Sequence, residues 1–581
     1  MGEMGESIRQ LRMPYLRFAS DRCNRAITAS IYDGFHTAYV AMPVDASSSR
    51  ALNDEATTTS CEKTAPDNPT RKGKQMLNRN ARSHTLSTAV RSARRTATVH
   101  CLALAAMLAL ISSVATAQRK PKAPSPASFP AVMMSDLHFD PFHDPAKVTL
   151  LVKAPLSQWK SILAIPQSPD QPARFAAIQE TCNAKESMDT PYALLQSSLT
   201  AAKAQAPQAG FVTVSGDLLV HDLDCRYRAA LGLPKSTKDD QSLSAAFAEK
   251  TTVFVMNQVE ATFPNIPVYI ALGNNDSRCN HNRLDSNDEY LKASATAVLA
   301  GLRGVTAAEK AIALRTYQSA GYYAVTMPTP MQRTRLIVVD DIYMMPKYTN
   351  CEAAEDNKGE QEQNIWLQKE LESAHQKNQR VWLLGHLPPT VNADSSLSAK
   401  GSFCATGKTV RFQTTDDLAN QIMANADTIK LGIFGHTHMD ELHLLRGASA
   451  SVPVKVIASI SPVDGNLPSF TVGTVDPASA TLADYSVYKA SNTTGVETRW
   501  AQEYSFNATY SEAGFSSASL SDLIDRMHAD KKGTDKESRA YQEHFLKGSS
   551  GKKLSPSWPG YVCSLDNATT QQFKSCVCGT P

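Results

Sequence analysis

The chain has 581 residues, longer than one typical domain, and its 42% hydrophobic and 20% charged residues are ordinary for a globular protein. Its formal net charge of +3 is unevenly spread: residues 1–117 contain 15 Lys and Arg against 9 Asp and Glu, and residues 118–581 contain 44 against 47. Beyond the first 117 residues, the charge balance therefore indicates no nucleic-acid partner.

The first 117 residues are predicted to lie outside the mature folded chain. Residues 1–90 are polar and aperiodic, and they are interpreted either as a disordered extension or as the result of a start codon assigned too far upstream. Residues 91–117 have the pattern of a signal peptide: arginines, an apolar run over 101–114, and an A-x-A cleavage sequence that ends at Ala117. The alternative is an uncleaved anchor. The pattern favours a secreted or periplasmic protein whose Pro-rich spacer, 118–130, precedes the first strand.

A short apolar strand followed by side chains able to bind a metal occurs five times after the spacer. The first strand is Ala131–Met134, followed by Asp136 and His138. Residues i and i+2 of an extended strand point to the same side, so these two side chains are expected to converge just past the strand. The other blocks are Phe211–Val214 before Ser215-Gly216-Asp217, Val268–Leu272 before Gly273-Asn274-Asn275-Asp276, Val381–Leu384 before Gly385-His386, and Leu431–Phe434 before Gly435-His436-Thr437-His438. Carboxylates, an amide and imidazoles at the carboxyl ends of strands indicate a transition-metal site.

The order of these blocks resembles that of the calcineurin-like metallophosphoesterase superfamily, D-x-H, G-D, G-N-H-[DE], G-H and G-H-x-H, over residues 131–490. Finer motifs are similar to the acid sphingomyelinase-like phosphodiesterase branch: SGDLLVHD at 215–222, GHLPPT at 385–390, GHTHMDE at 435–441 and ASISPVDGNLPSF at 458–470. The sequence GNND at 273–276, followed by His281 and Asn282, is also similar to the endopolyphosphatases of that branch.

The resemblance implies two divalent metal ions that share one carboxylate. It assigns one ion to Asp136, His138, Asp217 and His438, and the other to Asp217, Asn274, His386 and His436. Zinc is the first expectation for this mixed nitrogen and oxygen set, with Mn and Fe as alternatives. Gly435 is expected to bend the loop so that His436 and His438 face different ions. Two such ions can hold a bridging hydroxide that attacks phosphorus in line.

His221 and Asn275 are the candidate catalytic residues. Most of the superfamily has His after the metal-binding Asn, whereas Asn275 has an amide that can donate a hydrogen bond but not a useful proton. By resemblance, His221 matches a second leaving-group histidine of the branch and is expected to act as general acid, with Asp222 or Asp276 as the orienting carboxylate. Asn275 is expected to stabilise the transition state, and the alternative is that it serves only the turn.

The predicted fold class is an α/β, or α+β, αββα two-sheet sandwich over 131–500, with a cap-like insertion at 139–210 and a helical, Cys-containing C-terminal subdomain at 501–581. In the insertion, Phe142, His143 and Trp159 either line the site or pack within the insertion itself. Further strands are predicted at Arg335–Tyr343, Val454–Ser459, Phe470–Val475 and Thr481–Tyr488, and helices at Pro191–Ala206, Glu360–Gln376, Phe515–His528 and Asp535–Phe545.

Eight cysteines follow the signal, and an even number in an exported chain suggests disulfides whose pairing the sequence leaves open. By resemblance, Cys351 is expected to pair with Cys404, and Cys563 with either Cys576 or Cys578.

Three functions are consistent with these features. The first is a secreted two-metal phosphodiesterase acting on a small-molecule phosphate ester, the second is an endopolyphosphatase, and the third is a non-catalytic secreted metal-binding protein. The spacer is too short to contain the saposin-like lipid module of acid sphingomyelinase, which makes sphingomyelin a less favoured substrate.

Overall fold

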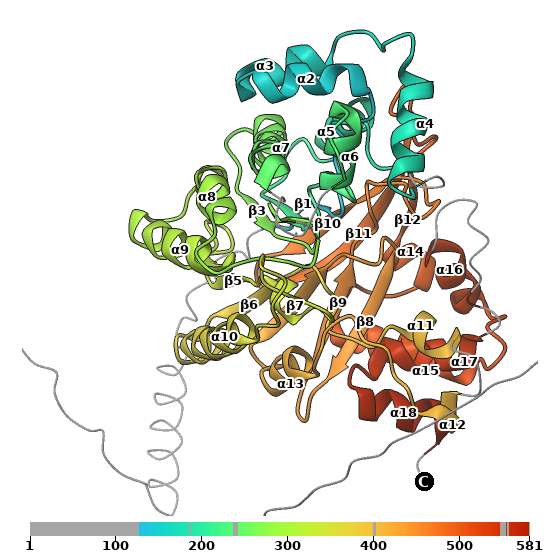
Figure 1. Ribbon diagram of the computed structural model, residues 1–581. Coiled ribbons are helices and arrows are strands. Elements are labelled where there is room, and N and C mark those ends of the chain that lie inside the picture. The colour runs from blue at the N-terminus through green and yellow to red at the C-terminus, as the bar shows by residue number, and fades with distance from the viewer. Residues whose placement is uncertain are drawn as a thin grey trace, which may run out of the picture. The chain divides into compact units, whose positions relative to one another are not determined.

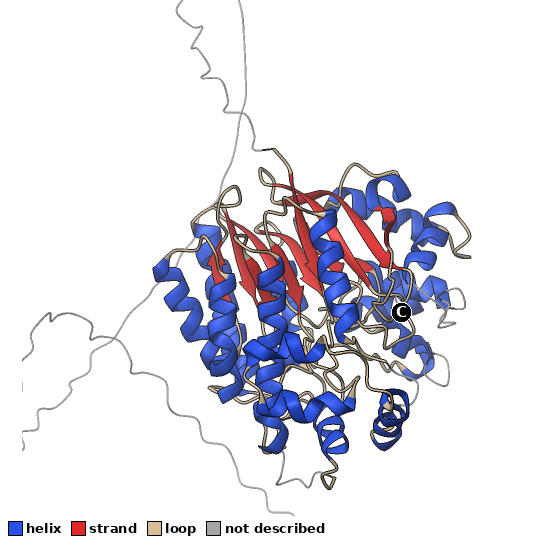
Figure 2. Ribbon diagram, turned by 90° about the horizontal axis from the view of Figure 1, so that it is seen from above, coloured by secondary structure: helices blue, strands red, loops and turns tan. Residues whose placement is uncertain are grey.

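Two six-stranded sheets with helices on their outer faces form the centre of the protein (Figures 1 and 2). The computed structural model describes residues 127–184, 188–235, 242–279, 281–398, 403–545, 554 and 557–579. The strand order is β12-β11-β10-β1-β2-β3 in the first sheet and β4-β5-β6-β7-β9-β8 in the second. The predicted α/β class with two mixed sheets is therefore confirmed.

Parallel strands bring several carboxyl ends to the same edge of each sheet. In the first sheet β1, β2 and β3 are parallel, and in the second β5, β6, β7 and β9 are parallel. The first sheet consists of β1 (Phe129–Met134), β2 (Val212–Ser215), β3 (Val268–Ala271), β10 (Ser469–Asp476), β11 (Thr481–Ala490) and β12 (Trp500–Ser505). The second consists of β4 (Tyr323–Thr326), β5 (Thr334–Val338), β6 (Arg380–Leu384), β7 (Ile429–Phe434), β8 (Glu441–Arg446) and β9 (Ser451–Val456).

Successive side chains of a strand point to opposite faces of the sheet, and in the second sheet both sets are apolar, so both faces are covered. In β6, Trp382 belongs to the main core, and its ring centroid lies 5.5 Å from that of Phe211 at the start of β2. Its neighbours Val381 and Leu383 belong to a second apolar core together with residues of α10 (Lys358–Gln376). A strand that is buried on both faces needs a continuous apolar run, which is how the sequence of β6 reads.

The insertion between β1 and β2 is helical and packs on α7 (Ser242–Thr262). Its helices are α2 (Pro145–Lys153), α3 (Leu156–Leu163), α4 (Gln171–Thr181) and α5 (Tyr192–Gln205). Trp159 and Phe142 are fully buried, and each packs on Phe247 of α7, with centroid distances of 5.3 and 5.5 Å. His143 packs on Phe175 at 4.9 Å. Of the two alternatives left open for these three residues, the structure supports packing within the insertion, which the buried rings stabilise.

The remaining helices lie around the two sheets. After β2 and β3 come α6 (Leu223–Leu231), α8 (Glu289–Gly301) and α9 (Ala307–Ala320), and beside the second sheet lie α11 (Ala393–Ser398), α12 (Phe403–Thr406) and α13 (Asp417–Ala424). The chain continues with α14 (Phe506–Tyr510), α15 (Ser517–Ala529), α16 (Lys536–Phe545), α17 (Trp558–Asp566) and α18 (Thr570–Cys578). Helices α15 and α17 contact β8, so the C-terminal helices extend the second sheet's side of the molecule (Figure 1).

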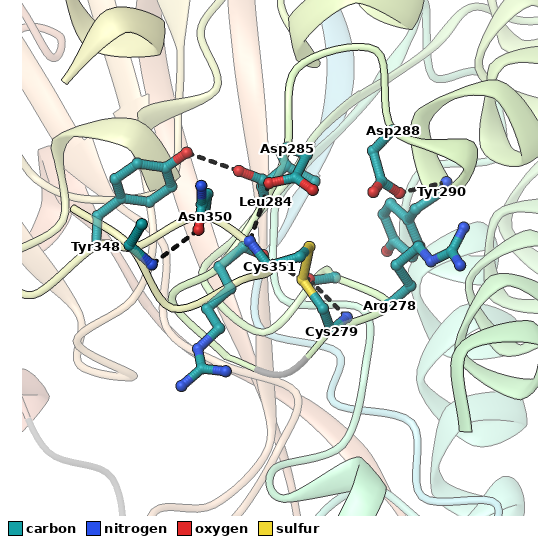
Figure 3. The surroundings of a disulfide bond; sticks show 12 residues. Arg278, Cys279, Leu284, Asp285, Asp288, Tyr290, Tyr348, Asn350 and Cys351 are labelled. Carbon is teal, nitrogen blue, oxygen red and sulfur yellow. Dashed lines mark hydrogen bonds between the residues drawn. A yellow bond between two sulfur atoms is a disulfide. The ribbon is translucent and has the colours of Figure 1, made fainter. Parts of the chain in front are cut away.

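Four disulfides join residues that are 13 to 174 positions apart in the sequence. The pairs are Cys182–Cys225, Cys279–Cys351, Cys404–Cys578 and Cys563–Cys576. The expected bridge between Cys351 and Cys404 is wrong: Cys351 bonds to the loop after β3, beside Asp285 and Asn350 (Figure 3). The pair Cys563–Cys576 is one of the two alternatives that the sequence left open.

Several elements differ from the sequence expectations. The strand expected at Arg335–Tyr343 ends at Val338, because the Asp340 carboxylate accepts from the backbone N–H of Ile342 and a 3-10 turn, η1 (Asp341–Met344), follows. Strands β4, β8 and β12 were not predicted, and β12 pairs with β11 inside the range expected to be helical. The predicted signal over 91–117, and residues 1–90, lie outside the described residues. Within the described ranges, no helix combines the length and apolarity needed to cross a membrane.

Candidate metal centre

The seven side chains predicted to bind metal meet at the carboxyl ends of five strands. Asp136 and His138 follow β1, Asp217 follows β2, Asn274 follows β3, His386 follows β6, and His436 and His438 follow β7. The three residues at the centre of this group, Asp136, His138 and His386, are fully buried. Open α/β sheets place their sites at this edge because the strands end there and the loops can approach one another.

Left-handed backbone conformations, rather than extended strands, direct the side chains inward. Asp136 and His138 have φ of 49° and 35°, and His436 and His438 have φ of 72° and 61°. The expectation of an extended Asp-x-His pair is therefore wrong, since β1 ends at Met134 and both residues have left-handed conformations in the loop that follows. Non-glycine residues with positive φ are uncommon and cluster at functional sites, where surrounding structure holds them.

Glycine at position 435 allows close approach, and the bend that it was expected to permit occurs at His436 and His438. A Cβ on Gly435 would lie 1.9 Å from Ser135 Oγ and 2.7 Å from Asp136 Oδ2. Positive φ occurs instead at His436 and His438. The β1 and β7 turns can meet only because this position has no side chain, and their contact includes hydrogen bonds from the His436 backbone N–H to the Asp136 carboxylate.

The first group of donors has the spacing of ligands around one ion. His138 Nε2 lies 3.2 Å from His438 Nε2 and 3.3 Å from Asp217 Oδ2. His438 Nε2 lies 3.3 Å from Asp136 Oδ1, which is 3.8 Å from His138 Nε2. Ligands on tetrahedral bonds of about 2.1 Å lie roughly 3.4 Å apart, so one divalent ion fits between these four donors.

The second group uses the same Asp217 oxygen. His386 Nε2 lies 3.3 Å from Asp217 Oδ2 and 3.0 Å from Asn274 Oδ1. Ligand atoms of Asp217, His386 and His436 all lie within 4.8 Å of one another. With Asp217 common to both groups, the donor set fits two divalent ions that share a carboxylate.

Hydrogen bonds at the opposite ring nitrogens set the imidazole tautomers. His138 Nδ1 lies 2.8 Å from the carbonyl oxygen of Leu219, and His386 Nδ1 lies 2.7 Å from that of Ser215. A carbonyl can only accept, so each Nδ1 carries the hydrogen. In the neutral ring, each Nε2 then directs a lone pair at the site, as a metal ligand requires.

Electrostatics keep the donors in forms that bind cations. Burial raises the pKa of Asp136, but His438 and other imidazoles more than offset this and lower it to about 2. Burial and neighbouring imidazolium charge lower the pKa of His138 to about 4 and of His436 to about 3, so both rings are neutral. Burial lowers the pKa of His386, but Asp217 and other carboxylates raise it to about 10 overall. A cation bound at that nitrogen displaces a proton.

Two buried carboxylates outside the donor set hold the ligand loops in place. Asp276 accepts hydrogen bonds from the backbone N–H groups of Leu218 (2.8 Å) and Gly273 (2.8 Å), which ties the β2 and β3 loops together. Asp341 Oδ2 accepts from the backbone N–H groups of His386 and Leu387, both at 2.8 Å. The role of Asp341 was not predicted from the sequence, because no ligand motif contains this residue.

His221 lies against the first donor group. Its ring stacks on His138 with a centroid distance of 4.0 Å, and 34% of its side chain is exposed. Its Nδ1 lies 3.0 Å from Asp189 Oδ1, and the buried Asp189 also accepts from the Ser461 hydroxyl and lies 3.6 Å from the Arg226 guanidinium. Burial lowers the pKa of His221, but Asp189 more than offsets this, and the pKa rises to about 9. An imidazolium has no lone pair for a metal and can donate a proton.

The carboxylate partner of His221 was not predicted from the sequence. It is Asp189, whereas Asp276 bonds to backbone and Asp222 is the N-cap residue of α6. Nothing in the local sequence around position 189 indicates this role. Asn275 donates from its backbone N–H to Asp217 Oδ1 and from its side-chain amide to Asp217 Oδ2, both at 2.8 Å, so the contact seen in the structure is with the shared carboxylate.

A cavity of about 300 Å³ opens beside His436. It lies between the turn after β7, the chain before α11, and the C-terminal helices α16 and α17. Its described lining comprises Val391, Asn392, Ala393, Asp394, Phe412, His436, Thr437, Met439, Glu441, Phe545, Leu554, Tyr561 and Ser564.

In sequence, the chain is similar to several proteins named as phosphodiesterases. No protein-family model matches the chain. A sphingomyelinase phosphodiesterase D of Dictyostelium discoideum is 27% identical over 228 residues, which cover 37% of this chain and 48% of that protein. An acid sphingomyelinase-like phosphodiesterase 3b of Homo sapiens is 24% identical over 409 residues, covering 67% of this chain and 80% of that protein. A human cyclic GMP-AMP phosphodiesterase is 23% identical over 335 residues, covering 55% and 66%.

Among solved structures, a dimetal phosphatase from Danio rerio aligns over 65% of this chain and 99% of its own, with 11% identity and a TM-score of 0.32. The two mixed sheets carry a donor set that shares one carboxylate. In sequence, the chain is similar to acid sphingomyelinase-like phosphodiesterases over the lengths given above. The prediction of a metal-dependent phosphoesterase is thereby confirmed.

Proposed function

We propose that this protein is an exported, zinc-dependent phosphodiesterase that hydrolyses small organic phosphate esters. The observation that carries the proposal is the convergence of seven donors into two groups around Asp217, with the imidazolium of His221 beside them. Neutral imidazoles and ionised carboxylates at tetrahedral spacing suit zinc, and Mn and Fe remain alternatives that a metal analysis distinguishes. The seven ligand assignments made from the sequence are part of this proposal.

The chain's own residues would position the phosphate ester and supply a proton. When bound, two divalent ions activate water and polarise the phosphoryl group. His221 would donate its Nε2 proton to the leaving oxygen, because its Nδ1–H is held by Asp189. Asn275 would keep Asp217 in place through one amide hydrogen, and its second amide hydrogen stays the predicted donor to the transition state.

The two other functions remain as outcomes of the test. The endopolyphosphatase alternative rested on GNND followed by His281 and Asn282. Asn282 donates its backbone N–H to the carbonyl oxygen of Asn274 at 2.8 Å, which supports the ligand loop whatever the substrate. A non-catalytic metal-binding role would need neither the proton donor at His221 nor its buried partner Asp189.

Export is part of the proposal and is supported by four disulfides, since such bonds persist in oxidising compartments. N-terminal sequencing of protein recovered from the periplasm or medium tests it, and a first residue other than one near Gln118 would contradict cleavage after Ala117.

The function is tested with bis(p-nitrophenyl) phosphate, using chain beginning at Gln118 and purified without chelator, with Zn, with Mn, or with no added metal. Asp217→Asn is expected to lose metal-dependent turnover, because the shared ligand loses its charge. Asp170→Asn, the same substitution at an exposed position outside the donor set, is the matched control and should retain activity. Metal bound without turnover on any ester or on polyphosphate would favour the binding role, and shortened polyphosphate chains without ester hydrolysis would favour the endopolyphosphatase.

A further inference from the structure

The cavity beside His436 and the proton donor His221 lie at different ends of the site. His221 stacks on His138, which belongs to the first donor group. The cavity is lined by His436, which belongs to the second. A phosphodiester has two ester substituents, and the leaving one must face the proton donor. The substituent that stays on phosphorus is then the one that can enter the cavity.

The cavity has an apolar wall built by distant parts of the chain. Phe412 and Met439 come from the catalytic half, and Phe545, Leu554 and Tyr561 come from the C-terminal segment. The disulfide Cys404–Cys578 ties α12 to α18, and Cys563–Cys576 ties α17 to α18. These covalent bonds hold the two walls at a set separation, so the cavity is preformed, as small-molecule sites usually are.

Glu441 places a negative charge in this wall. Its side chain is only 7% exposed and lines the cavity, and Oε2 accepts from the Tyr561 hydroxyl at 3.0 Å and lies 3.4 Å from His443 Nε2. Burial raises the pKa of Glu441, but the hydrogen bond and the charge of His443, with hydrogen bonds from Thr437 and Tyr561, more than offset this, so the carboxyl group is ionised at neutral pH. His443 does not line the cavity, and among the described lining residues there is no Lys or Arg, so Glu441 is the charge that faces the cavity together with Asp394.

We propose that Glu441 is a specificity-determining residue that selects the substituent retained on phosphorus. The inference rests on the proposed phosphodiesterase function and deepens it. The cavity takes an organic group that combines an apolar, preferably aromatic, body with a cationic or N–H-donating end. Such an end pairs with the carboxylate and with the faces of the neighbouring aromatic rings. An anionic substituent, such as a further phosphate or a carboxylate, is rejected because two buried like charges repel.

The test uses three p-nitrophenyl phosphodiesters that release the same alcohol and differ only in the retained group: para-aminomethylbenzyl, para-ethylbenzyl and para-carboxymethylbenzyl. The first two have the same shape and differ in charge. For the metal-loaded enzyme we expect kcat/KM for the aminomethyl ester to exceed that for the ethyl ester by about tenfold, and the carboxymethyl ester to be slower again by about tenfold or more. Glu441→Gln keeps the volume and should reduce both ratios to within about twofold.

Glu543→Gln is the matched control, because Glu543 is exposed on α16, two residues from Phe545, and does not line the cavity. It should leave both ratios unchanged. A measurement on the wild-type enzyme alone guards against misfolding of the variant: para-aminomethylbenzyl phosphate should inhibit about tenfold more strongly than para-ethylbenzyl phosphate. Equal rates for all three esters, or ratios that persist in Glu441→Gln, would overturn this inference and leave the phosphodiesterase function intact. Failure to hydrolyse any of the three with any metal would instead count against the proposed function.

Discussion

Replacing Asp189 with Asn tests whether His221 acts as the general acid. The substitution keeps the shape of the side chain and an oxygen that can accept from His221 Nδ1. It removes the negative charge that raises the pKa of His221 to about 9 against the effect of burial. With that charge gone, burial should lower the pKa of His221 from that value.

The magnitude of the shift follows from the exposure of the pair. The pKa of about 9 and the ordinary histidine value of 6.5 differ by more than two units, but 34% of the His221 side chain is exposed and water screens the charges. We therefore expect the alkaline limb of kcat to move to lower pH by about one to two units in Asp189→Asn. A general acid is active when protonated, so activity falls as the pH rises through its pKa. Bound cations lower the pH of the alkaline limb in wild type and in Asp189→Asn alike. Only the difference in that pH between the two proteins is therefore compared.

The assay is kcat of an alkyl p-nitrophenyl diester and of a dialkyl diester between about pH 5 and about pH 10, with metal saturating. Asp170→Asn, the same change at an exposed position of the insertion, is the control and should not move the limb. The protonated form of His221 stabilises the folded state below its unfolded pKa of 6.5, and this contribution is lost as the pH rises through about 9. The difference in melting temperature between wild type and Asp189→Asn should accordingly shrink above that pH. If the alkaline limbs of wild type and Asp189→Asn superimpose, the pairing of Asp189 with His221 does not set the pKa of the general acid.

Three further substitutions test other contacts. His221→Ala should reduce turnover of dialkyl esters by about a hundredfold but that of p-nitrophenyl esters only slightly, since nitrophenolate leaves without a proton; equal losses on both would defeat the assignment. Gly435→Ala should lower the bound metal per chain, measured by elemental analysis, because its Cβ would lie 1.9 Å from Ser135 Oγ, and full metal content would contradict the close-approach argument. Lys455→Met should destabilise the fold by about 3–5 kcal/mol in denaturant unfolding, since Lys455 is fully buried against Asp440 and its loss removes the cation paired with that carboxylate. A loss within experimental error would show that Asp440 is satisfied by its other partners.

Local patterns in the sequence were sufficient for the two-sheet class and for the identity of the candidate ligands. Strands such as β6 and β7 are short apolar runs that end at a glycine, and this signal depends only on neighbouring residues. The prediction failed where the conformation depends on contacts outside the apolar run itself. The strand expected at Arg335–Tyr343 ended early because the Asp340 carboxylate caps a turn, and β12 was missed because its pairing with β11 determines its conformation.

In the candidate site too, some features follow from local sequence and others from the tertiary structure. The residue types and their order along the chain already specified a carboxylate, amide and imidazole set for two metals, because each ligand follows its own strand. The tertiary structure determined which atoms meet. It brought Asp189 next to His221, which is 32 residues away in the sequence, and it placed the Asp341 carboxylate where it accepts from the backbone N–H of His386.

Tertiary packing also determined the disulfide pairing and the walls of the cavity. The sequence determined that eight cysteines would be available, but Cys351 bonds to Cys279 rather than Cys404 because the loops after β3 and after η1 lie side by side. The walls of the cavity around Glu441 come from segments more than a hundred residues apart, so no local pattern could predict them. Ligand chemistry is a property of single residues and is readable from the chain, whereas the pairing of charges, sulfurs and cavity walls depends on how strands and helices pack.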